Sequence, residues 1–443
     1  MNKLCNLDMY REAVKDADPY EYGGRVSQIL GLTVEAVGLT AKLGDICRIY
    51  TEKRDKYILS EVVGFKDKKV VLMPFGDLSG AGPNSHVVSE ERQLNVAVGK
   101  DFCGRVLDGL GNPMDGKGKV KIQGRYPIMN QPPNPMERSR ITERLTMGIK
   151  AIDSMLTLGM GQRVGIFSGS GVGKSTLLGM IARNTSADIN VIVLIGERGR
   201  EVRDFIEKDL KEEGLKRSVL VVATSDQPAL VRLKSAMVGT AIAEFFRDQG
   251  YNVMLLMDSL TRFAMAQREI GMAIGEPPVS RGFTPSVYAI LPKLLERAGT
   301  GKRGSITGLY TVLVEGDDMD EPISDTVRGI LDGHIILSRK IANANHYPAI
   351  DVLQSISRLM PDVTSREDRE KTSFIRSVMA IYKDAQDLIS IGAYKKGSSK
   401  KIDEAIELIG PINDLLRQQV GERFSYEETM RLVNEIYDRR EVE

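Results

Sequence analysis

Apolar residues follow two different patterns in the first part of the chain. Over residues 1–20 they recur at helical spacing, and Asp18-Pro19 is expected to end that helix. From residue 21 to residue 92 the runs are short, rich in strand-forming residues, and separated by clusters of Gly, Asp and Lys. The expected strands are residues 25–30, 46–50, 58–65 and 69–74. Short strands at regular spacing predict a small N-terminal β-barrel.

A longer alternation of strand-like and helix-like segments covers residues 93–368. The expected strands are residues 163–167, 190–195, 219–223, 252–257, 306–314 and 335–338, and a long helix is expected over residues 229–248. Residues 253–257 are apolar at every position, which is typical of a strand buried on both faces. This alternation predicts an α/β core built on a mostly parallel sheet.

The last segment, residues 369–443, is charged and helical in its periodicity, which predicts a C-terminal helical domain. The expected helix breaks are Gly392, Gly397 and Gly410-Pro411. Residues 395–401 carry four lysines, and we expect a solvated turn there.

The composition excludes several classes of function. A length of 443 residues suits about three domains. The net charge of +1, from 61 basic and 60 acidic side chains, gives no electrostatic footprint for nucleic acid or an anionic membrane. No apolar run approaches the ~20 residues of a membrane span, and the N-terminus lacks the apolar core of a secretory signal. A role at a membrane is therefore expected to depend on partner proteins.

The cysteines, Cys5, Cys47 and Cys103, are widely spaced, and the chain has only three histidines. No zinc pattern can be drawn from them. We therefore expect three reduced thiols in a cytosolic protein.

A glycine-rich stretch, Gly-Ser-Gly-Val-Gly-Lys-Ser at residues 169–175, lies between the strand 163–167 and a helix expected to begin at Lys174. This context is the one that a phosphate-binding loop requires. The glycines let successive backbone N–H groups cradle phosphates, and the helix N-terminus adds a partial positive charge. Lys174 is expected to reach the outer phosphates and Ser175 to bind Mg²⁺. The stretch predicts that the protein binds and hydrolyses ATP.

The loop departs from the strict pattern at one position, because Ser168 stands where that pattern has Gly. A serine fits there only if the backbone needs no conformation that is restricted to glycine, so Ser168 is where we look first for strain. The predicted nucleotide-binding residues of this segment are Ser168, Gly169, Ser170, Gly171, Val172, Gly173, Lys174, Ser175 and Thr176.

Two carboxylates follow expected strands of the core. Asp258 ends the strand 252–257, at the edge where open α/β sheets bind ligands, and is expected to hold Mg²⁺ through water. Glu197 follows the strand 190–195, the next strand after the phosphate-loop helix. Neighbouring strands of a parallel sheet end on the same side, so Glu197 is expected to reach the γ-phosphate and polarise the attacking water.

Four longer stretches carry a family resemblance. They are GRVLDGLGNPMDG at residues 104–116, GERGREV at 196–202, DSLTRF at 258–263 and PAIDVLQSIS at 348–357. With these stretches the chain resembles the catalytic subunits of rotary ATP synthases and their relatives in protein export. The core is then expected to be RecA-like. Residues 169–183, 276–288 and 392–397 resemble the flagellum-specific ATPases of flagellar type III export more than the synthase β subunit, with the injectisome ATPases as close cousins.

The resemblance implies a role for each matching residue. Glu197 matches the catalytic glutamate, and Glu201 a second carboxylate near the waters of the metal. Arg262 matches an active-site arginine that follows the strand ending at Asp258. Arg358 matches an arginine finger donated across a subunit interface, and Tyr347 an aromatic side chain that stacks on adenine.

The resemblance also implies partners. They are a homohexamer of the chain itself, a stator-like regulator on the N-terminal helix, a coiled-coil stalk in the pore, the export gate and chaperone–substrate complexes. The acidic residues 316–321 fall in a region that faces the pore in that family. The protein is then expected in the cytoplasm, at the cytoplasmic face of the export apparatus.

Several alternatives stay open. An injectisome ATPase shares most of the motifs. An ATP synthase catalytic subunit fits less well, because residues 369–443 lack its acidic tract that faces the stalk. An RNA translocase of the transcription-termination type needs a basic, aromatic-rich N-terminal surface, which residues 20–90 do not show. A non-catalytic ring subunit is expected to lack the catalytic carboxylate, and Glu197 is present.

Overall fold

The computed structural model describes residues 11, 23–51, 56–314, 316 and 318–440. The chain divides into two compact units, Met1–Leu94 and Asn95–Glu443, and each is described by itself. The helix predicted over residues 1–20 lies outside the described residues, apart from Arg11. Within the described ranges no helix is both long enough and apolar enough to cross a membrane.

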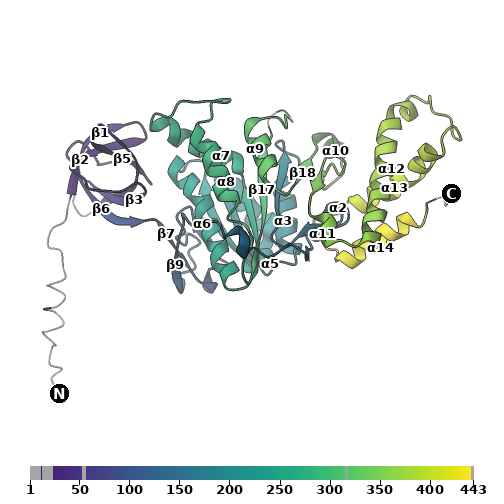
Figure 1. The fold of residues 1–443 in the computed structure, drawn as a ribbon, viewed down its shortest axis with the longest axis horizontal. Coiled ribbons are helices and arrows are strands. Elements are labelled where there is room, and N and C mark those ends of the chain that lie inside the picture. Colours follow the sequence, from purple (N-terminus) through teal and green to yellow (C-terminus); the bar gives the residue numbers. More distant parts are fainter. Residues whose placement is uncertain (1–10, 12–22, 52–55, 315, 317, 441–443) are drawn as a thin grey trace, which may run out of the picture. The chain divides into compact units, whose positions relative to one another are not determined.

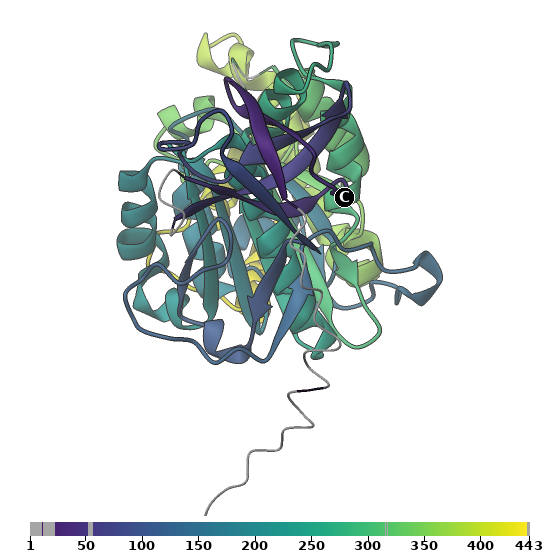
Figure 2. The ribbon, with the colours of Figure 1, turned by 90° about the vertical axis from the view of Figure 1, so that its left-hand side faces the viewer.

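The described part of the first unit is a closed antiparallel barrel with the strand order β1-β2-β5-β4-β3-β6, coloured purple to blue in Figures 1 and 2. Its strands are β1 (Gly23–Leu30), β2 (Thr33–Val37), β3 (Asp45–Tyr50), β4 (Tyr57–Lys66), β5 (Lys69–Pro74) and β6 (His86–Gln93). Val34, Leu72 and Val87 are fully buried inside it. The predicted barrel is confirmed, although the prediction missed β2 and β6, the two strands that pair with β1 and so close the sheet.

The second unit is built on one large sheet. Among the described residues its strands run in the order β19-β18-β12-β17-β15-β13-β14-β8, and β16 pairs with β17. The strands are β8 (Val106–Asp108), β12 (Arg163–Ser168), β13 (Ile189–Glu197), β14 (Ser218–Thr224), β15 (Asn252–Asp258), β16 (Gly299–Thr300), β17 (Ser305–Leu313), β18 (Gly333–Leu337) and β19 (Ile356–Ser357). Only the β16–β17 and β18–β19 pairs are antiparallel, which confirms the mostly parallel sheet.

Two short ribbons accompany this sheet. They pair β7 (Asn95–Val98) with β9 (Gly124–Pro127) and β10 (Arg144–Leu145) with β11 (Leu158–Gly159).

The strand order corrects one expectation. β13 does not neighbour β12, because β17 and β15 lie between them. The segments that supply these two strands come later in the chain, so the sequence order of β12 and β13 does not reveal the gap. Glu197 therefore lies beside the end of β15, not beside the end of β12.

The described helices of the second unit are α2 (Lys150–Met155), α3 (Lys174–Asn184), α4 (Gly199–Asp204), α5 (Lys211–Lys216), α6 (Ala229–Asp248), α7 (Leu260–Ala273), α8 (Pro285–Leu295), α9 (Pro322–Ile330), α10 (Arg339–Asn343), α11 (Met360–Val363), α12 (Arg366–Ser390), α13 (Lys400–Leu416) and α14 (Tyr426–Tyr437). A π-helical turn (Phe205–Leu210) joins α4 to α5.

Helices α6 and α3 lie on opposite faces of the sheet, as the alternation of side chains along β13 shows. A Cβ on Gly239 of α6 would lie 2.2 Å from the side chain of Val193, so α6 contacts that face directly. Leu194 points to the other face, because successive residues of a strand alternate. It belongs to the buried cluster that contains Leu177 and Leu178 of α3.

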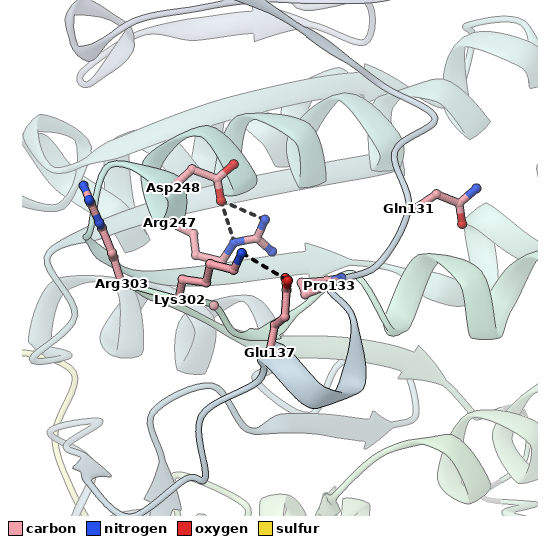
Figure 3. A pocket seen from close by; sticks show the side chains of 8 residues that line it. Gln131, Pro133, Glu137, Arg247, Asp248, Lys302 and Arg303 are labelled. Carbon is pink, nitrogen blue, oxygen red and sulfur yellow. Dashed lines mark hydrogen bonds and ion pairs between the residues drawn. The ribbon is translucent and has the colours of Figure 1, made fainter.

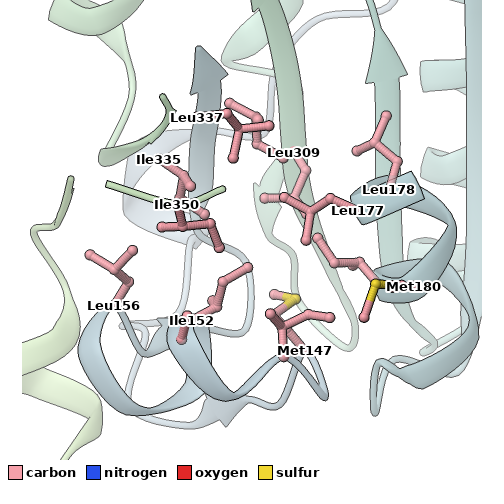
Figure 4. Close-up of a cluster of buried hydrophobic side chains, with 14 of the residues drawn as sticks. Met147, Ile152, Leu156, Leu177, Leu178, Met180, Leu309, Ile335, Leu337 and Ile350 are labelled. Carbon is pink, nitrogen blue, oxygen red and sulfur yellow. The ribbon is translucent and has the colours of Figure 1, made fainter. Parts of the chain in front are cut away.

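Figure 4 shows part of this cluster, in which α2 and α3 meet the strands. Ile152, Leu177 and Ile335 come from segments far apart in the sequence and are each at most 2% exposed. Burying a side chain of this kind contributes about 1.5–3 kcal/mol. The cluster therefore fixes α3, and with it the loop that precedes α3, against the sheet.

The C-terminal helices α12, α13 and α14 pack on one another and on α2 (Figure 1). The helix break predicted at Gly410-Pro411 is wrong, because α13 continues through both residues. Leu408 and Ile412, on either side, are buried, and this tertiary packing outweighs the backbone hydrogen bond that proline removes. Residues 395–399 form the turn between α12 and α13 and are mostly exposed, as predicted for this stretch.

The domain boundaries stay predictions. The compact units separate after Leu94, close to the predicted boundary at residues 92 and 93. The predicted boundary between residues 368 and 369 falls inside α12 (Arg366–Ser390), and the second compact unit continues across it.

Candidate active site

The glycine-rich loop begins where β12 ends. Gly171 and Gly173 have φ angles of 78° and 88°, in the left-handed region that glycine adopts without strain. α3 follows at Lys174, and no side chain caps its N-terminus. Its first N–H groups therefore remain available to a ligand, and the helix dipole favours an anion there. The backbone of this loop fits a phosphate group.

Ser168 carries no backbone strain. It is the last residue of β12 and pairs in register with Leu313 on one side and Leu337 on the other. Its backbone is therefore extended, a conformation open to any residue. Its hydroxyl is buried and finds no hydrogen-bond partner among the described residues.

Lys174 and Asp258 form a direct ion pair at the carboxyl edge of the sheet. Lys174 Nζ lies 2.5 Å from Asp258 Oδ1, which also accepts a hydrogen bond from Thr311 Oγ1 at 2.8 Å. Asp258 is 4% exposed. The paired cation and hydroxyl satisfy a carboxylate that would otherwise be costly to bury.

Glu197 ends β13 beside this pair. Burial, the negative charge of Asp258 and a hydrogen bond with Glu201 together raise the pKa of Glu197 to about 7, against the opposing effects of Lys174 and Arg262. A carboxyl group with a pKa near neutrality can hold or release a proton at physiological pH, which general acid–base catalysis requires. The structure thus brings Glu197, Asp258 and Lys174 together.

Arg262 lies across the backbone of the residue that precedes Glu197. Gly196 has a φ of 69°, and a Cβ at this position would lie 3.4 Å from the Arg262 side chain. The aliphatic part of the Arg262 side chain thus packs against the end of β13. Glu201, in the first turn of α4, is about half exposed and lies 3.4 Å from Arg198.

Tyr347 lies on the other side of the loop, where a Cβ on Gly173 would contact its ring at 3.5 Å. The ring is 43% exposed and lines a pocket of about 210 Å³. The other lining residues are Val172, Gly173, Thr176, Leu177, Met180, Leu337, Pro348, Ala349, Gln418, Gln419 and Val420. This mostly apolar pocket fits a flat heterocycle beside the phosphate loop.

Three residues of this pocket, Gln418, Gln419 and Val420, were not predicted from the sequence. Gln418 is 4% exposed, donates its backbone N–H to the carbonyl of Tyr347 at 3.0 Å, and accepts from the N–H of Lys150 at 2.8 Å. These residues lie in the loop between α13 and α14, and only the fold brings that loop to the phosphate site. No local motif could have identified them.

Arg358 lies at the opposite edge of the sheet. It follows β19, whose Ser357 pairs with Gly333 at the start of β18, and its backbone N–H donates to the carbonyl of Asp332 at 3.0 Å. β12 extends from this amino edge to the phosphate loop over six residues, which at about 3.3 Å per residue separates the two edges by roughly 17 Å. The exposed Arg358 is therefore not part of the site in its own chain.

The described residues contain no cluster of three or more His, Cys, Asp or Glu side chains that could hold a metal ion by themselves. Mg²⁺ at nucleotide sites is usually held by one or two carboxylates together with phosphate oxygens and water. Ser175 and Asp258, on either side of Lys174, fit that limited role.

The acidic residues 316–321 are only partly described, since residues 315 and 317 lie outside the described ranges. Asp318 pairs with Arg281 at 3.0 Å, and both side chains are about half exposed. The acidic stretch is thereby linked to the loop that precedes α8.

A second pocket, of about 390 Å³, lies near the amino end of β17 (Figure 3). Four of the five charged side chains that line it pair with one another, Lys302 with Glu137 at 3.1 Å and Arg247 with Asp248 at 2.9 Å. It has neither a glycine-rich loop nor a free helix N-terminus, so it does not compete with the phosphate loop as a nucleotide site.

Comparison with known proteins agrees with this geometry. The model of the ATP synthase alpha/beta family nucleotide-binding domain matches residues 148–357, and that of the family's beta-barrel domain matches residues 26–90. The T3SS EscN ATPase C-terminal domain matches residues 364–435. The flagellum-specific ATP synthase of Bacillus subtilis is 52% identical over 95% of this chain and 96% of its own length. This chain belongs to the ATP synthase alpha/beta family. It is a P-loop ATPase.

Relatives within the family come from two export systems. The type 3 secretion system ATPase of Xanthomonas euvesicatoria is 50% identical over 98% of both chains. The assembled ATPase EscN from the type III secretion system of enteropathogenic E. coli has a TM-score of 0.87 and 43% identity, over 94% of this chain and 100% of EscN. A second structure, with the same scores, holds EscN in complex with its central stalk EscO.

Proposed function

We propose that this protein is the ATP-hydrolysing motor of a type III protein export apparatus, and that the apparatus is the flagellar one. The observation that carries the proposal is the meeting of Lys174, Asp258 and Glu197 beside a phosphate loop with a free helix N-terminus. Relatives with 50–52% identity over nearly the whole chain are named for flagellar or type III secretion ATPases, which supports the setting.

The phosphates of ATP bind to the backbone N–H groups of the loop and of the first turn of α3. Lys174 then exchanges its contact with Asp258 for the outer phosphates, which leaves Asp258 and Ser175 to hold Mg²⁺. Mg²⁺, when bound, neutralises charge that develops on the phosphate oxygens. Glu201 orients water around the metal, and Tyr347 stacks on the adenine ring.

Glu197 orients the attacking water and accepts its proton. The raised pKa makes this carboxylate a stronger base than an ordinary glutamate. Arg262 lies beside the same carboxylate and stabilises its charged form.

Arg358 completes the site of a neighbouring subunit in a homohexamer. Its exposure and its place at the edge opposite the phosphate loop support a role in trans. An arginine supplied in trans is worth about 10³–10⁵ in rate in GTPases. The existence of an assembled form of EscN supports a ring in this family.

The proposed partners follow from this setting. A coiled-coil stalk enters the pore, as the EscN–EscO complex suggests for its own system, and a stator-like regulator binds the N-terminal segment. Chaperone–substrate complexes and the export gate complete the assembly at the cytoplasmic face of the membrane. An injectisome is the second candidate setting, because relatives from both systems are almost equally similar.

The catalytic part of the proposal is tested with Glu197→Gln. We expect this variant to bind ATP as the wild type does and to lose turnover by about 10²–10⁴-fold, because the amide cannot accept the proton. Equilibrium binding of a fluorescent ATP analogue and a phosphate-release assay measure the two quantities. Undiminished hydrolysis would remove Glu197 from the mechanism.

Affinity capture from the source cells tests the setting. Recovery of chaperones for flagellar rod, hook or filament proteins supports the flagellar apparatus. Recovery of injectisome chaperones supports the second candidate, and recovery of only membrane rotor and stalk subunits contradicts both. ATP hydrolysis stimulated by added RNA would favour an RNA translocase instead.

A further inference from the structure

A fully buried glutamine lies at the amino edge of the core sheet. Gln162 is 0% exposed and directly precedes β12, the strand that leads to the phosphate loop. Burying an amide side chain is costly unless its donors and acceptor are satisfied. Its position, far from the phosphate loop, gives it no direct part in binding ATP.

The side-chain amide of Gln162 holds the segment that carries Arg358. Its Nε2 donates to the hydroxyl of Ser357 at 3.1 Å and to the carbonyl of Asp332 at 3.2 Å. Its Oε1 accepts the N–H of Gly159 at 2.9 Å. Both hydrogens of the amide group and its oxygen are thus engaged, which only asparagine and glutamine can achieve from one side chain.

Two further contacts restrict the same segment. The Ser357 hydroxyl donates to the carbonyl of Thr157 at 2.9 Å, so Ser357 is held from two sides. A Cβ on Gly333 would lie 2.5 Å from the carbonyl oxygen of Ile356, which shows how closely the two backbones approach. The residue immediately before Arg358 therefore has one position available.

Asp332 anchors Arg358 itself. Its carbonyl accepts the N–H of Arg358 at 3.0 Å, and its carboxylate accepts the N–H and Nε of Arg163 at 3.0 and 3.1 Å. The backbone of Arg358 is thus attached, through Asp332 and Ser357, to the two consecutive residues Gln162 and Arg163. The long Arg358 side chain has no such anchor and is exposed.

We propose that Gln162 is the positioning residue for Arg358, and that it sets the direction in which this arginine leaves its subunit towards the phosphate site of the neighbour. The inference rests on the proposed function, in which Arg358 acts in trans. A displacement of about 1 Å in a reacting or stabilising group can cost as much as 10²-fold in rate. A rigid anchor for Arg358 therefore has a direct kinetic consequence in the adjacent subunit.

Two inactive variants of the subunit, mixed together, test whether Gln162 acts on the site of the neighbouring subunit. The acceptor carries Arg358→Ala and keeps its phosphate loop, and the donor carries Lys174→Ala and keeps Arg358. Each species alone is expected to be inactive. Mixed in equal amounts, they should recover turnover at roughly one interface in four, by random assortment in a ring of cyclic symmetry. Sedimentation confirms that each mixture assembles.

Gln162→Leu is then placed in one species at a time. In the donor it should lower the recovered kcat by about 10- to 100-fold and leave the KM for ATP unchanged, because the acceptor supplies the nucleotide-binding residues. In the acceptor, which has no Arg358, it should leave the recovered turnover unchanged. A merely structural role would instead lower turnover equally in both placements.

Each outcome decides a different question. Equal loss in both placements, or no loss in the donor, overturns the positioning role of Gln162. No recovery in the unsubstituted mixture overturns the proposed action of Arg358 in trans, so the two failures are distinguishable.

A second variant covers the case in which Gln162→Leu fails to fold. Ser357→Ala removes the same hydrogen bond from the other side and leaves the bonds from Gln162 to Gly159 and Asp332 intact. It should lower the recovered kcat when it is placed in the donor and leave it unchanged when it is placed in the acceptor. Thr240→Val in the donor is the matched control, since it removes a buried hydroxyl of α6 that bonds only within its own helix. It should leave the recovered turnover unchanged.

Discussion

At the carboxyl edge of the core sheet, Lys174, Asp258 and Glu197 gather around a loop whose N–H groups remain available to a ligand. At the amino edge of the same sheet, Gln162 and Asp332 hold the backbone before Arg358 in a closed set of hydrogen bonds. Groups at the first edge must change partners when ATP binds and leaves. In the proposed function, groups at the second edge keep theirs, because they present Arg358 to a neighbouring subunit.

In the proposed function, one sheet thus supports two half-sites with opposite requirements. The phosphate edge has a partly buried carboxyl group with a pKa raised to about 7, and a buried serine hydroxyl without a partner among the described residues. The arginine edge satisfies its fully buried glutamine completely. Four measurements test whether the two edges work in this way.

Removal of the arginine should have the largest effect. We expect Arg358→Ala to lower turnover by about 10³-fold or more, because transition-state charge on the neighbour's phosphate loses its partner, with ATP affinity nearly unchanged. Phosphate release and ATP binding are measured on the assembled ring. Arg366→Ala, which removes an exposed arginine paired only with Glu370 nearby, is the control. Full turnover by Arg358→Ala would contradict the assignment of two half-sites.

Removal of the aromatic ring beside the phosphate loop comes next. Tyr347→Ala should raise the KM for ATP by about 5- to 150-fold, because stacking of an aromatic ring on a base is worth about 1–3 kcal/mol. Tyr347→Phe keeps the ring and should retain the wild-type KM. If the KM for ATP did not change in Tyr347→Ala, the pocket that includes Gln418 would not hold adenine.

The pH dependence tests the raised pKa of Glu197. Because its neutral form is favoured in the fold, the active carboxylate is lost below the raised value of about 7, not below the ordinary value of 4.5. We expect kcat/KM to rise about tenfold per pH unit below pH 7 and to level off above it. A profile that stays flat down to pH 5.5 would contradict the electrostatics described for this edge.

The smallest effect is expected from a change of Asp332, which anchors the backbone at the arginine edge. Asp332→Asn weakens the pairing with Arg163, and the free energy of unfolding should fall by about 1–3 kcal/mol, the cost of impairing a hydrogen-bonded charge pair. The KM for ATP should be unchanged, because no ATP contact lies at this edge. Chemical denaturation and steady-state kinetics measure the two quantities. A raised KM would show that the two edges are not independent.

The local motifs predicted much of the site. The run from Gly169 to Ser175 lies between a strand and a helix, as its spacing implied, and Asp258 ends a buried strand. These predictions succeeded because the chemistry and its structural context lie within about ten consecutive residues. Ser168, the irregular position, turned out to be an ordinary strand residue.

The remaining features depend on contacts between distant segments. The insertion of β15 and β17 between β12 and β13 comes from residues that follow both strands in the sequence. The contribution of Gln418 depends on the packing of the α13–α14 loop, and the helix persists through Pro411 because its neighbours are buried. Local helix and strand propensities and residue spacing carry no information on contacts between distant segments.

The placement of Arg358 opposite the phosphate loop determines how complete sites can be counted. With Arg358 acting in trans as proposed, contacts between subunits are head-to-tail, so a pair of subunits has one complete site and leaves one loop and one arginine unmatched. Every subunit added to an open row contributes one more site but keeps both ends unmatched. Only closure of the row matches the last loop with the first arginine, so the final subunit adds two sites instead of one.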